Sequence, residues 1–259
     1  MPKFFVCSDI HSYFHIFKDA LDKAGYDVNN PDHYIICCGD YFDRGPEPLA
    51  TMDFFANSPR TILIRGNHED LLKECINRED FGMHDIQNGT VATILAFGQR
   101  LPKDIEELSQ ACRIADTKLQ PFFNKMVNYF ETENYIFVHG WIPSLDDGLP
   151  AWYAKKRRYT YNSEWRESHE KDWRRARWTN GMEAWSQGNI EPNKTIVCGH
   201  WHTSWGHHFL HNWGVEWGDN SHFTPFEDKG IIAIDACTAY SNKVNILVIE
   251  DNFLKENGQ

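Results

Sequence analysis

The sequence feature that most constrains this chain is the heptapeptide Gly39–Gly45 (GDYFDRG), which directly follows the apolar run Tyr34–Cys38. The run is short, rich in β-branched and aromatic residues, and followed by a glycine, so it predicts a buried strand. Asp40, Asp43 and Arg44 then leave the end of that strand together in a turn. Taken alone, so short a motif could equally be an ordinary acidic loop.

Four further apolar runs end in polar clusters of a similar kind. Each is a predicted strand followed by carboxylate, imidazole or amide side chains. In open α/β sheets, ligands bind just outside the carboxyl ends of the strands, so five such ends can converge on one site. The clusters are Asp9-x-His11 after Phe4–Cys7, Gly66-Asn67-His68-Glu69 after Thr61–Ile64, His139-Gly140 after Tyr135–Val138, and Gly199-His200-x-His202 after Thr195–Cys198.

Together, these five clusters resemble the motifs of the calcineurin-like metallophosphoesterases, and within that group those of the protein serine/threonine phosphatase (PPP) branch. They run from residue 9 to residue 202, so the resemblance spans most of the chain. It implies an α/β fold: a calcineurin-like four-layer α/β/β/α sandwich with a helical insertion and a dinuclear metal site at the C-terminal ends of the strands. We expect one metallophosphoesterase domain over residues 1–259.

The resemblance also implies a ligand set for two divalent metal ions. Asp40 would bridge them, since one carboxylate is shared in such a centre. His202 departs from the PPP pattern and matches the G-H-x-H of the wider group, in which the second imidazole joins the first metal; otherwise it would only hydrogen-bond in the pocket. The expected ligands are Asp9, His11, Asp40 and His202 for the first ion, and Asp40, Asn67, His139 and His200 for the second.

The donor types narrow the choice of metal without fixing it. Mixed carboxylate, imidazole and amide ligands without thiolate suit manganese, iron or zinc. We expect manganese, with iron or zinc as the alternatives. Each ligand histidine also needs a hydrogen-bond acceptor for its other ring nitrogen, and Asp235 is a candidate for that role.

Catalytic and phosphate-binding roles follow from the same resemblance. His68 would protonate the leaving alkoxide as general acid, oriented by the carboxylate of Asp43, which fixes the tautomer and supports the imidazolium form. Arg44 has the fork geometry to bind two phosphoryl oxygens. Alternatively, it forms an ordinary surface salt bridge. Asn67 would also contact the phosphate. PPP enzymes carry a second phosphate-binding arginine upstream of the last histidine motif, and Arg177 is the candidate here.

Composition excludes several other classes of protein. The net charge of −11 argues against a general nucleic-acid binder, which would normally be basic. The seven cysteines are odd in number and mostly lie in or beside apolar strand runs, which indicates small buried hydrophobes in a reducing compartment. No signal-peptide core precedes Ser8, and no apolar run approaches the ~20 residues of a membrane helix. We expect a cytoplasmic protein without membrane contact.

The rest of the chain divides into three parts. The first 64 residues alternate strand and helix, which implies a largely parallel sheet. Residues 70–131 carry helix-period apolar patches and predict a helical insertion. Residues 141–192 form a Trp/Arg-rich insertion whose basic run Lys155–Arg158 is either a solvated surface or a rim that gathers anionic substrate. In the tail, 231–234 and 244–249 predict two strands, antiparallel because their connection is short.

These inferences favour a metal-dependent phosphomonoesterase in which metal-bound hydroxide attacks phosphoserine or phosphothreonine on a protein, or a small phosphomonoester. A dinucleoside-polyphosphate (diadenosine tetraphosphate-type) hydrolase is the first alternative, because the local tryptophans could stack a base. A phosphodiesterase and an inactive scaffold follow. The partner expected is therefore a phosphorylated protein or small phosphate ester, with no nucleic acid; the sequence leaves the oligomeric state open.

Overall fold

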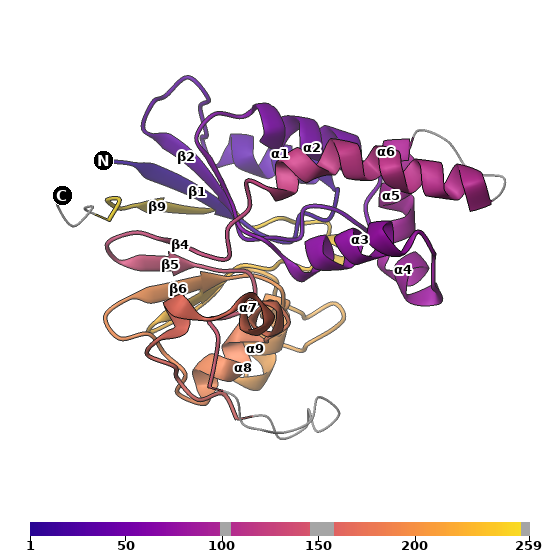
Figure 1. Ribbon diagram of the computed structural model, residues 1–259. Helices are drawn as coiled ribbons and strands as arrows, with labels where there is room; N and C mark the ends of the chain where they lie inside the picture. Colours follow the sequence, from indigo (N-terminus) through magenta and orange to yellow (C-terminus); the bar gives the residue numbers. More distant parts are fainter. Residues whose placement is uncertain (99–104, 146–157, 255–259) are drawn as a thin grey trace.

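The computed structural model describes residues 1–98, 105–145 and 158–254 of the chain (Figure 1). Two β-sheets lie face to face in the middle of the molecule, and helices cover the outer face of each sheet. This mixed α/β arrangement in layers confirms the predicted fold class. Among the described residues, no helix is both long and apolar enough to cross a membrane.

The first sheet has the strand order β3-β2-β1-β9. β1, β2 and β3 run parallel, and β9 runs antiparallel to β1. Helices α1 (Phe14–Lys23) and α2 (Pro48–Asn57) connect the parallel strands, as the alternating pattern predicts. The strands are β1 (Lys3–Cys7), β2 (His33–Cys37), β3 (Thr61–Leu63) and β9 (Leu247–Glu250).

The second sheet has the order β4-β5-β6-β8-β7. Its three central strands, β5, β6 and β8, run parallel, and an antiparallel strand closes each edge. The carboxyl ends of β5 and β6 therefore lie at one end of this sheet. The strands are β4 (Phe130–Glu131), β5 (Tyr135–Phe137), β6 (Thr195–Cys198), β7 (Phe226–Asp228) and β8 (Ile231–Ala233).

The prediction for the tail is wrong in one respect. β8 and β9 do not pair with each other: β8 lies between β6 and β7 in the second sheet, whereas β9 lies at the edge of the first. Helix α10 (Thr238–Ser241), which is flanked by left-handed residues at Cys237 and Asn242, carries the chain from one sheet to the other. The short connection therefore joins two sheets instead of making a hairpin.

Residues 67–98 and 105–123, the described part of this segment, confirm the helix-period interpretation, since they form four helices on the side of the first sheet. Shorter helices cover the second sheet (Figure 1). Lys155, Lys156 and Arg157 of the predicted basic rim lie outside the described residues. The helices are α3 (Asn67–Arg78), α4 (Met83–Asn88), α5 (Thr90–Gly98), α6 (Ile105–Phe123), the 3-10 helix η2 (Trp165–Glu167), α7 (Glu170–Ala176), α8 (Gly181–Ser186) and α9 (Thr203–Phe209).

Three apolar clusters fill the spaces between the layers. One lies between the sheets and includes Phe4, Ile36, Phe137 and Val197. The second packs the first sheet against α1, α2, α3, α5 and α6, and the third packs the second sheet against α7 and α8. Because the strands are buried on both faces, their sequences are continuous apolar runs, and polar side chains appear only where the strands end.

Candidate metal centre and active site

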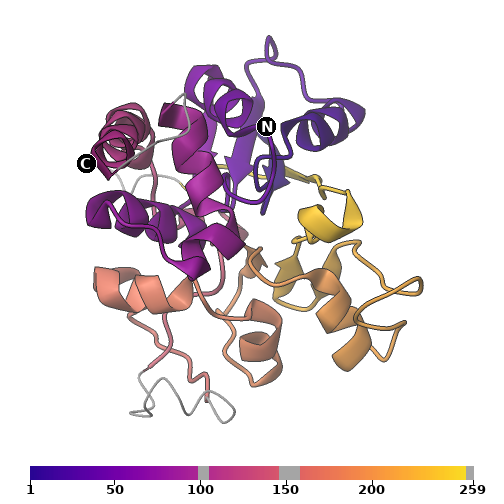
Figure 2. The ribbon, with the colours of Figure 1, turned by 90° about the vertical axis from the view of Figure 1, so that its right-hand side faces the viewer.

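The polar clusters that follow β1, β2, β3, β5 and β6 converge at one end of the two sheets. Figure 2 looks onto this end, with the helices of the first half of the chain on one side and those of residues 160–210 on the other. Four of the candidate ligands there have left-handed backbones, with φ of 53° at Asp9, 49° at His11, 57° at Asp40 and 68° at His200. Such conformations cost about 1–3 kcal/mol each and cluster at functional sites.

Asp40 lies at the centre of the site. Its carboxylate belongs to two groups of possible metal ligands, one with His11 and His68 and the other with His139 and His200. Oδ2 lies 3.7 Å from Nε2 of His11, and Oδ1 lies 3.3 Å from Nε2 of His139. A carboxylate with one oxygen toward each group has the geometry of a bridge between two cations.

The hydrogen bonds of the histidine rings orient their second nitrogens toward Asp40. Nδ1 of His11 donates to the carbonyl of Phe42 at 2.9 Å, and Nδ1 of His139 donates to that of Cys38 at 2.7 Å. Each ring therefore presents Nε2 as a lone pair, the form in which a neutral imidazole binds a metal. Backbone carbonyls thus supply the acceptor role for which the sequence suggested Asp235.

In the group around His139, several hydrogen-bond acceptors lie close together and no donor lies between them. Nε2 of His139 lies 2.8 Å from Oδ1 of Asn67 and close to the Asp40 carboxylate. Burial lowers the pKa of His139 despite the neighbouring Asp40 carboxylate, so this ring is neutral. Nε2 of His200 is buried and has no hydrogen-bond partner. A cation would satisfy these converging lone pairs, so the residues fit a metal ion here.

The pKa shifts of the neighbouring carboxylates and of His200 also indicate a site for a cation. Burial, with the nearby carboxylates of Asp235 and Asp40, raises the pKa of Asp9 well above its ordinary value. Burial also raises the pKa of Asp235, to about 6. Burial followed by the effect of His139 lowers the pKa of His200 to about 3. Buried carboxylates beside neutral imidazoles, with no thiolate, form the donor set expected for manganese, iron or zinc.

Glu69 fixes the turn that carries Asp40. The sequence motifs predicted no role for this residue. Its Oε2 accepts the backbone N–H groups of Asp40 and Gly66 at 3.0 and 2.9 Å, and its Oε1 accepts that of Tyr41 at 3.0 Å. Gly66 has to be glycine, because a Cβ there would meet the Asp40 carboxylate and backbone. Asn67 follows directly as the buried first residue of α3.

His68 forms a second hydrogen-bonded unit beside the ligands. Its Nδ1 donates to Oδ2 of Asp43 at 2.8 Å, and Nη2 of Arg44 lies 3.2 Å from its Nε2. Burial lowers the pKa of His68, but the carboxylates of Asp40 and Asp43 outweigh it, so that the pKa lies above the ordinary value. Arg44 is exposed, and its guanidinium is therefore open to an incoming anion.

Two threonines hold Asp43 in place, and the sequence gave no signal for either. The hydroxyl of Thr90 donates to Oδ2 of Asp43 at 2.8 Å, and that of Thr93 donates to Oδ1 at 2.9 Å. Both belong to α5, in the predicted helical insertion. The insertion therefore contributes directly to the orientation of His68. No motif spacing could have found these residues, because they lie 47 and 50 positions from Asp43.

His202 is not a member of either group of possible metal ligands around Asp40. Its Nε2 faces Oε1 of Glu216 at 3.4 Å, and its Nδ1 lies 2.9 Å from Oγ of Ser204. The ring of Trp217 lies against it, with a centroid distance of 4.3 Å. Both ring nitrogens thus have partners on the α9 side, so the alternative of a hydrogen-bonding histidine fits this chain better.

Arg177 is buried in a network of polar side chains. Its guanidinium is bound by Asp70 at 2.7 Å, Asn128 at 2.8 Å and Glu170 at 2.6 Å. The side chain is 2% exposed. These contacts join α3 to α7 and occupy the fork that a phosphate would need, so the residue has the geometry of a structural link.

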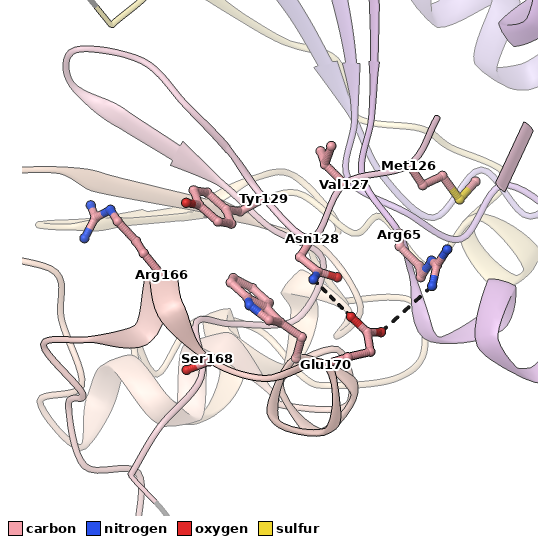
Figure 3. Close-up of a pocket in the computed structure, with 9 residues that line it drawn as sticks. Arg65, Met126, Val127, Asn128, Tyr129, Arg166, Ser168 and Glu170 are labelled. Carbon is pink, nitrogen blue, oxygen red and sulfur yellow. Dashed lines mark hydrogen bonds and ion pairs between the residues drawn. The ribbon is translucent and has the colours of Figure 1, made fainter. Parts of the chain in front are cut away.

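Asn128 and Glu170 also line a lateral pocket of about 500 Å³, shown in Figure 3. The dashed lines there mark the bond from Asn128 to Glu170 and the ion pair between Arg65 and Glu170. None of the candidate metal ligands is among the residues that line it. The pocket therefore lies outside the metal centre.

Comparison with known proteins gives one family match and several structural ones. The sequence profile for calcineurin-like phosphoesterases matches residues 2–217. A crystal structure of a candidate diadenosine tetraphosphatase superposes with a TM-score of 0.53 at 14% identity, over 96% of this chain and 91% of that one.

Two phosphatases with named sources also superpose. A cold-active protein tyrosine phosphatase from Shewanella gives a TM-score of 0.46 at 14% identity, over 97% of this chain and 76% of that one. A protein serine/threonine phosphatase from Saccharomyces cerevisiae gives 0.45 at 15% identity, over 99% of this chain and 81% of that one. At such identities the likeness to solved structures is one of fold alone.

Proposed function

The chain belongs to the calcineurin-like phosphoesterase family, and from that premise we propose that it hydrolyses phosphomonoesters with two divalent cations held around Asp40. The observation that carries the proposal is the position of Asp40 between two groups of possible metal ligands. Asp9, His11 and Asp40 would hold one cation, and Asp40, Asn67, His139 and His200 the other. Bound cations of this kind lower the pKa of water and neutralise charge on phosphoryl oxygens.

Arg44 and His68 supply the remaining functions that ester cleavage needs. Arg44 donates to Nε2 of His68 in the structure, so that nitrogen carries no proton in this arrangement. A phosphoryl group binding to Arg44 would draw the guanidinium away, and Nε2 could then take up a proton. Asp43, held by its two threonines, stabilises the resulting imidazolium. His68 would donate this proton to the departing alkoxide.

A monoester is proposed because the site combines the general acid His68 with the exposed guanidinium of Arg44, which can bind the phosphoryl group. Phosphoserine, phosphothreonine and small phosphomonoesters all offer a dianionic phosphoryl group for Arg44 and the cations. Manganese remains the proposed metal. We also retain the cytoplasm as the proposed location, since Cys7, Cys37, Cys38 and Cys198 are buried free thiols.

The test is a panel of substrates with added manganese, iron or zinc. The panel contains p-nitrophenyl phosphate, bis-p-nitrophenyl phosphate, a phosphoserine peptide and diadenosine tetraphosphate. We expect turnover of the monoesters and its loss in Asp40→Asn, with manganese giving the highest rate. Turnover of the diester alone would overturn the proposal in favour of a phosphodiesterase. Lack of any turnover with every metal would favour an inactive scaffold.

A further inference from the structure

A continuous band of exposed aromatic rings begins at the candidate metal ligand His200. Its members come from four separate segments: the turn after α7, the turn between β6 and α9, the loop after α9, and α10. Each side chain exposes more than a third of its surface to solvent. The members of this aromatic band are Trp178 (44% exposed), Trp201 (36%), Trp217 (47%) and Tyr240 (51%).

Two members of the aromatic band contact His200 itself. The ring of Trp178 lies 5.8 Å from that of His200 at an interplanar angle of 83°, and the ring of Trp201 lies 5.9 Å away at 60°. The band therefore contacts the candidate metal centre through the rings of Trp178 and Trp201.

The other two members extend the band away from the centre. Trp201 stacks on His202 with a centroid distance of 6.1 Å and an angle of 21°, and Trp217 lies on the same imidazole. Tyr240 follows, 5.2 Å from Trp217. These contacts hold the rings in order and leave part of each exposed.

Packing of the core does not account for this exposure. Trp141, Trp165 and Trp173 lie in the apolar cluster of the second sheet and are at most 3% exposed. The aromatic band has no comparable cover among the described residues, and contiguous exposed apolar surface of this kind marks ligand sites. Indole and phenol rings provide rigid faces on which a planar group can stack.

The position of the aromatic band indicates which part of the substrate it would contact. That part is the alcohol of the ester, on the far side of the scissile bond. Asp40 and His139 are buried, whereas His200 is the partly exposed member of its ligand group. An alcohol that extends from a phosphoryl group beside Asp40 toward solvent on the side of His200 would pass the rings that flank this residue. Those rings are Trp178 and Trp201.

We propose that Trp178 and Trp201 stack the leaving group of the substrate and so select phosphoesters whose alcohol carries a planar aromatic ring. This inference rests on the phosphomonoesterase function proposed above. Two sources of such a ring are a nucleobase and a phenol. Lys171, Arg174, Arg175 and Trp178 line a pocket of about 360 Å³ beside the band. Arg174 and Arg175 there pair with Glu74 and Asp172, but both arginines are exposed, and such pairs are weak. A further phosphate group can therefore compete for their guanidinium groups, which favours a nucleotide over a phenolic ester.

The test compares esters that differ only in aromaticity. Benzyl phosphate and cyclohexylmethyl phosphate have similar size and the same CH2–O linkage, so the ratio of their kcat/KM values isolates stacking. We expect the wild-type enzyme to prefer the benzyl ester. The double variant Trp178→Leu/Trp201→Leu should lower the ratio about tenfold, since stacking on an aromatic side chain changes affinity by roughly five- to a hundredfold.

Three controls separate stacking from damage to the metal centre. Trp213→Leu removes an equally exposed tryptophan that stacks on His222, away from His200, and should leave the ratio unchanged. Trp178→Phe/Trp201→Phe keeps two aromatic faces and should restore most of the preference. Metal content by mass spectrometry should be the same in all these variants, because none removes a ligand.

A second pair of substrates identifies the source of the ring. Adenosine 5′-monophosphate is compared with ribose 5-phosphate, and phosphotyrosine with phosphoserine. We expect the nucleotide pair to show the larger dependence on Trp178 and Trp201. An unchanged benzyl ratio in the double leucine variant, with active enzyme, would overturn the inference alone. Absence of turnover of every ester would overturn the proposed function, and the inference would fall with it.

Discussion

Replacing Arg177 with methionine separates a structural link from a phosphate ligand. Methionine is close to the aliphatic part of arginine in length, so Arg177→Met keeps the packing of the stem and removes the guanidinium. The change deletes three hydrogen bonds, to Asp70, Asn128 and Glu170. It leaves the Asp70 carboxylate, whose side chain is 12% exposed, without its partner.

The size of the effect follows from burial. Removing one partner of a buried ion pair costs about 3–5 kcal/mol, because the remaining charge is uncompensated. Glu170 is 58% exposed, so water compensates for its share of the loss and the lower end applies. We therefore expect a destabilisation of about 3 kcal/mol. With an unfolding entropy of about 2.1 cal/mol/K per residue over 259 residues, the melting temperature falls by about 6 °C.

The assay is thermal unfolding of the metal-loaded protein together with steady-state kinetics on p-nitrophenyl phosphate. Arg174→Met, three positions earlier in α7, is the matched control, since Arg174 pairs with Glu74 at an exposed position. That variant should lose at most about 1 kcal/mol. We expect KM to be unchanged in both variants. A large rise in KM for Arg177→Met, without loss of stability, would refute this reasoning and restore the phosphate-binding role.

The remaining predictions concern the proposed general acid His68, the role of His202 and the ion pairs of Glu131. His68→Ala should lower kcat about 10²–10⁴-fold, most for poor leaving groups, with both metals retained; an unaffected rate would exclude the acid role. His202→Ala should leave metal content unchanged, because His202 faces Glu216, and loss of a metal ion would restore it as a ligand. Burial raises the pKa of Glu131, but Arg166 and Lys194 outweigh it, so the folded-state pKa is lowered. This stabilisation is present above the unfolded-state pKa of about 4.3 and is lost as pH falls through the folded value. The difference in melting temperature between wild type and Glu131→Gln should therefore shrink on acidification from pH 7, and a constant difference would contradict it.

The sequence predicted the parts of the site that strand ends determine. Asp9, Asp40 and His139 each come within three residues of an apolar run, and parallel strands in register place such residues at one end of a sheet. The left-handed backbone at Asp9 and Asp40 is a consequence of the turns that leave their strands. Local pattern and global topology agree here, which is why short motifs were sufficient.

The sequence could not predict partners that come from elsewhere in the fold. His202 has the spacing of a ligand, but the loop after α9 brings Glu216 and Trp217 against it. Arg174, Arg175 and Arg177 are nearly equivalent by spacing, and only the position of α7 against α3 places the third one on Asp70. The threonines that hold Asp43 depend in the same way on the packing of α5.

The central claim is that two cations share the carboxylate of Asp40. A crystal of the manganese-loaded protein, with diffraction recorded at the manganese absorption edge, tests it most directly. The account predicts two anomalous peaks, one beside His11 and one beside His139, with Asp40 between them. A single peak, or peaks that Asp40 does not join, would contradict it.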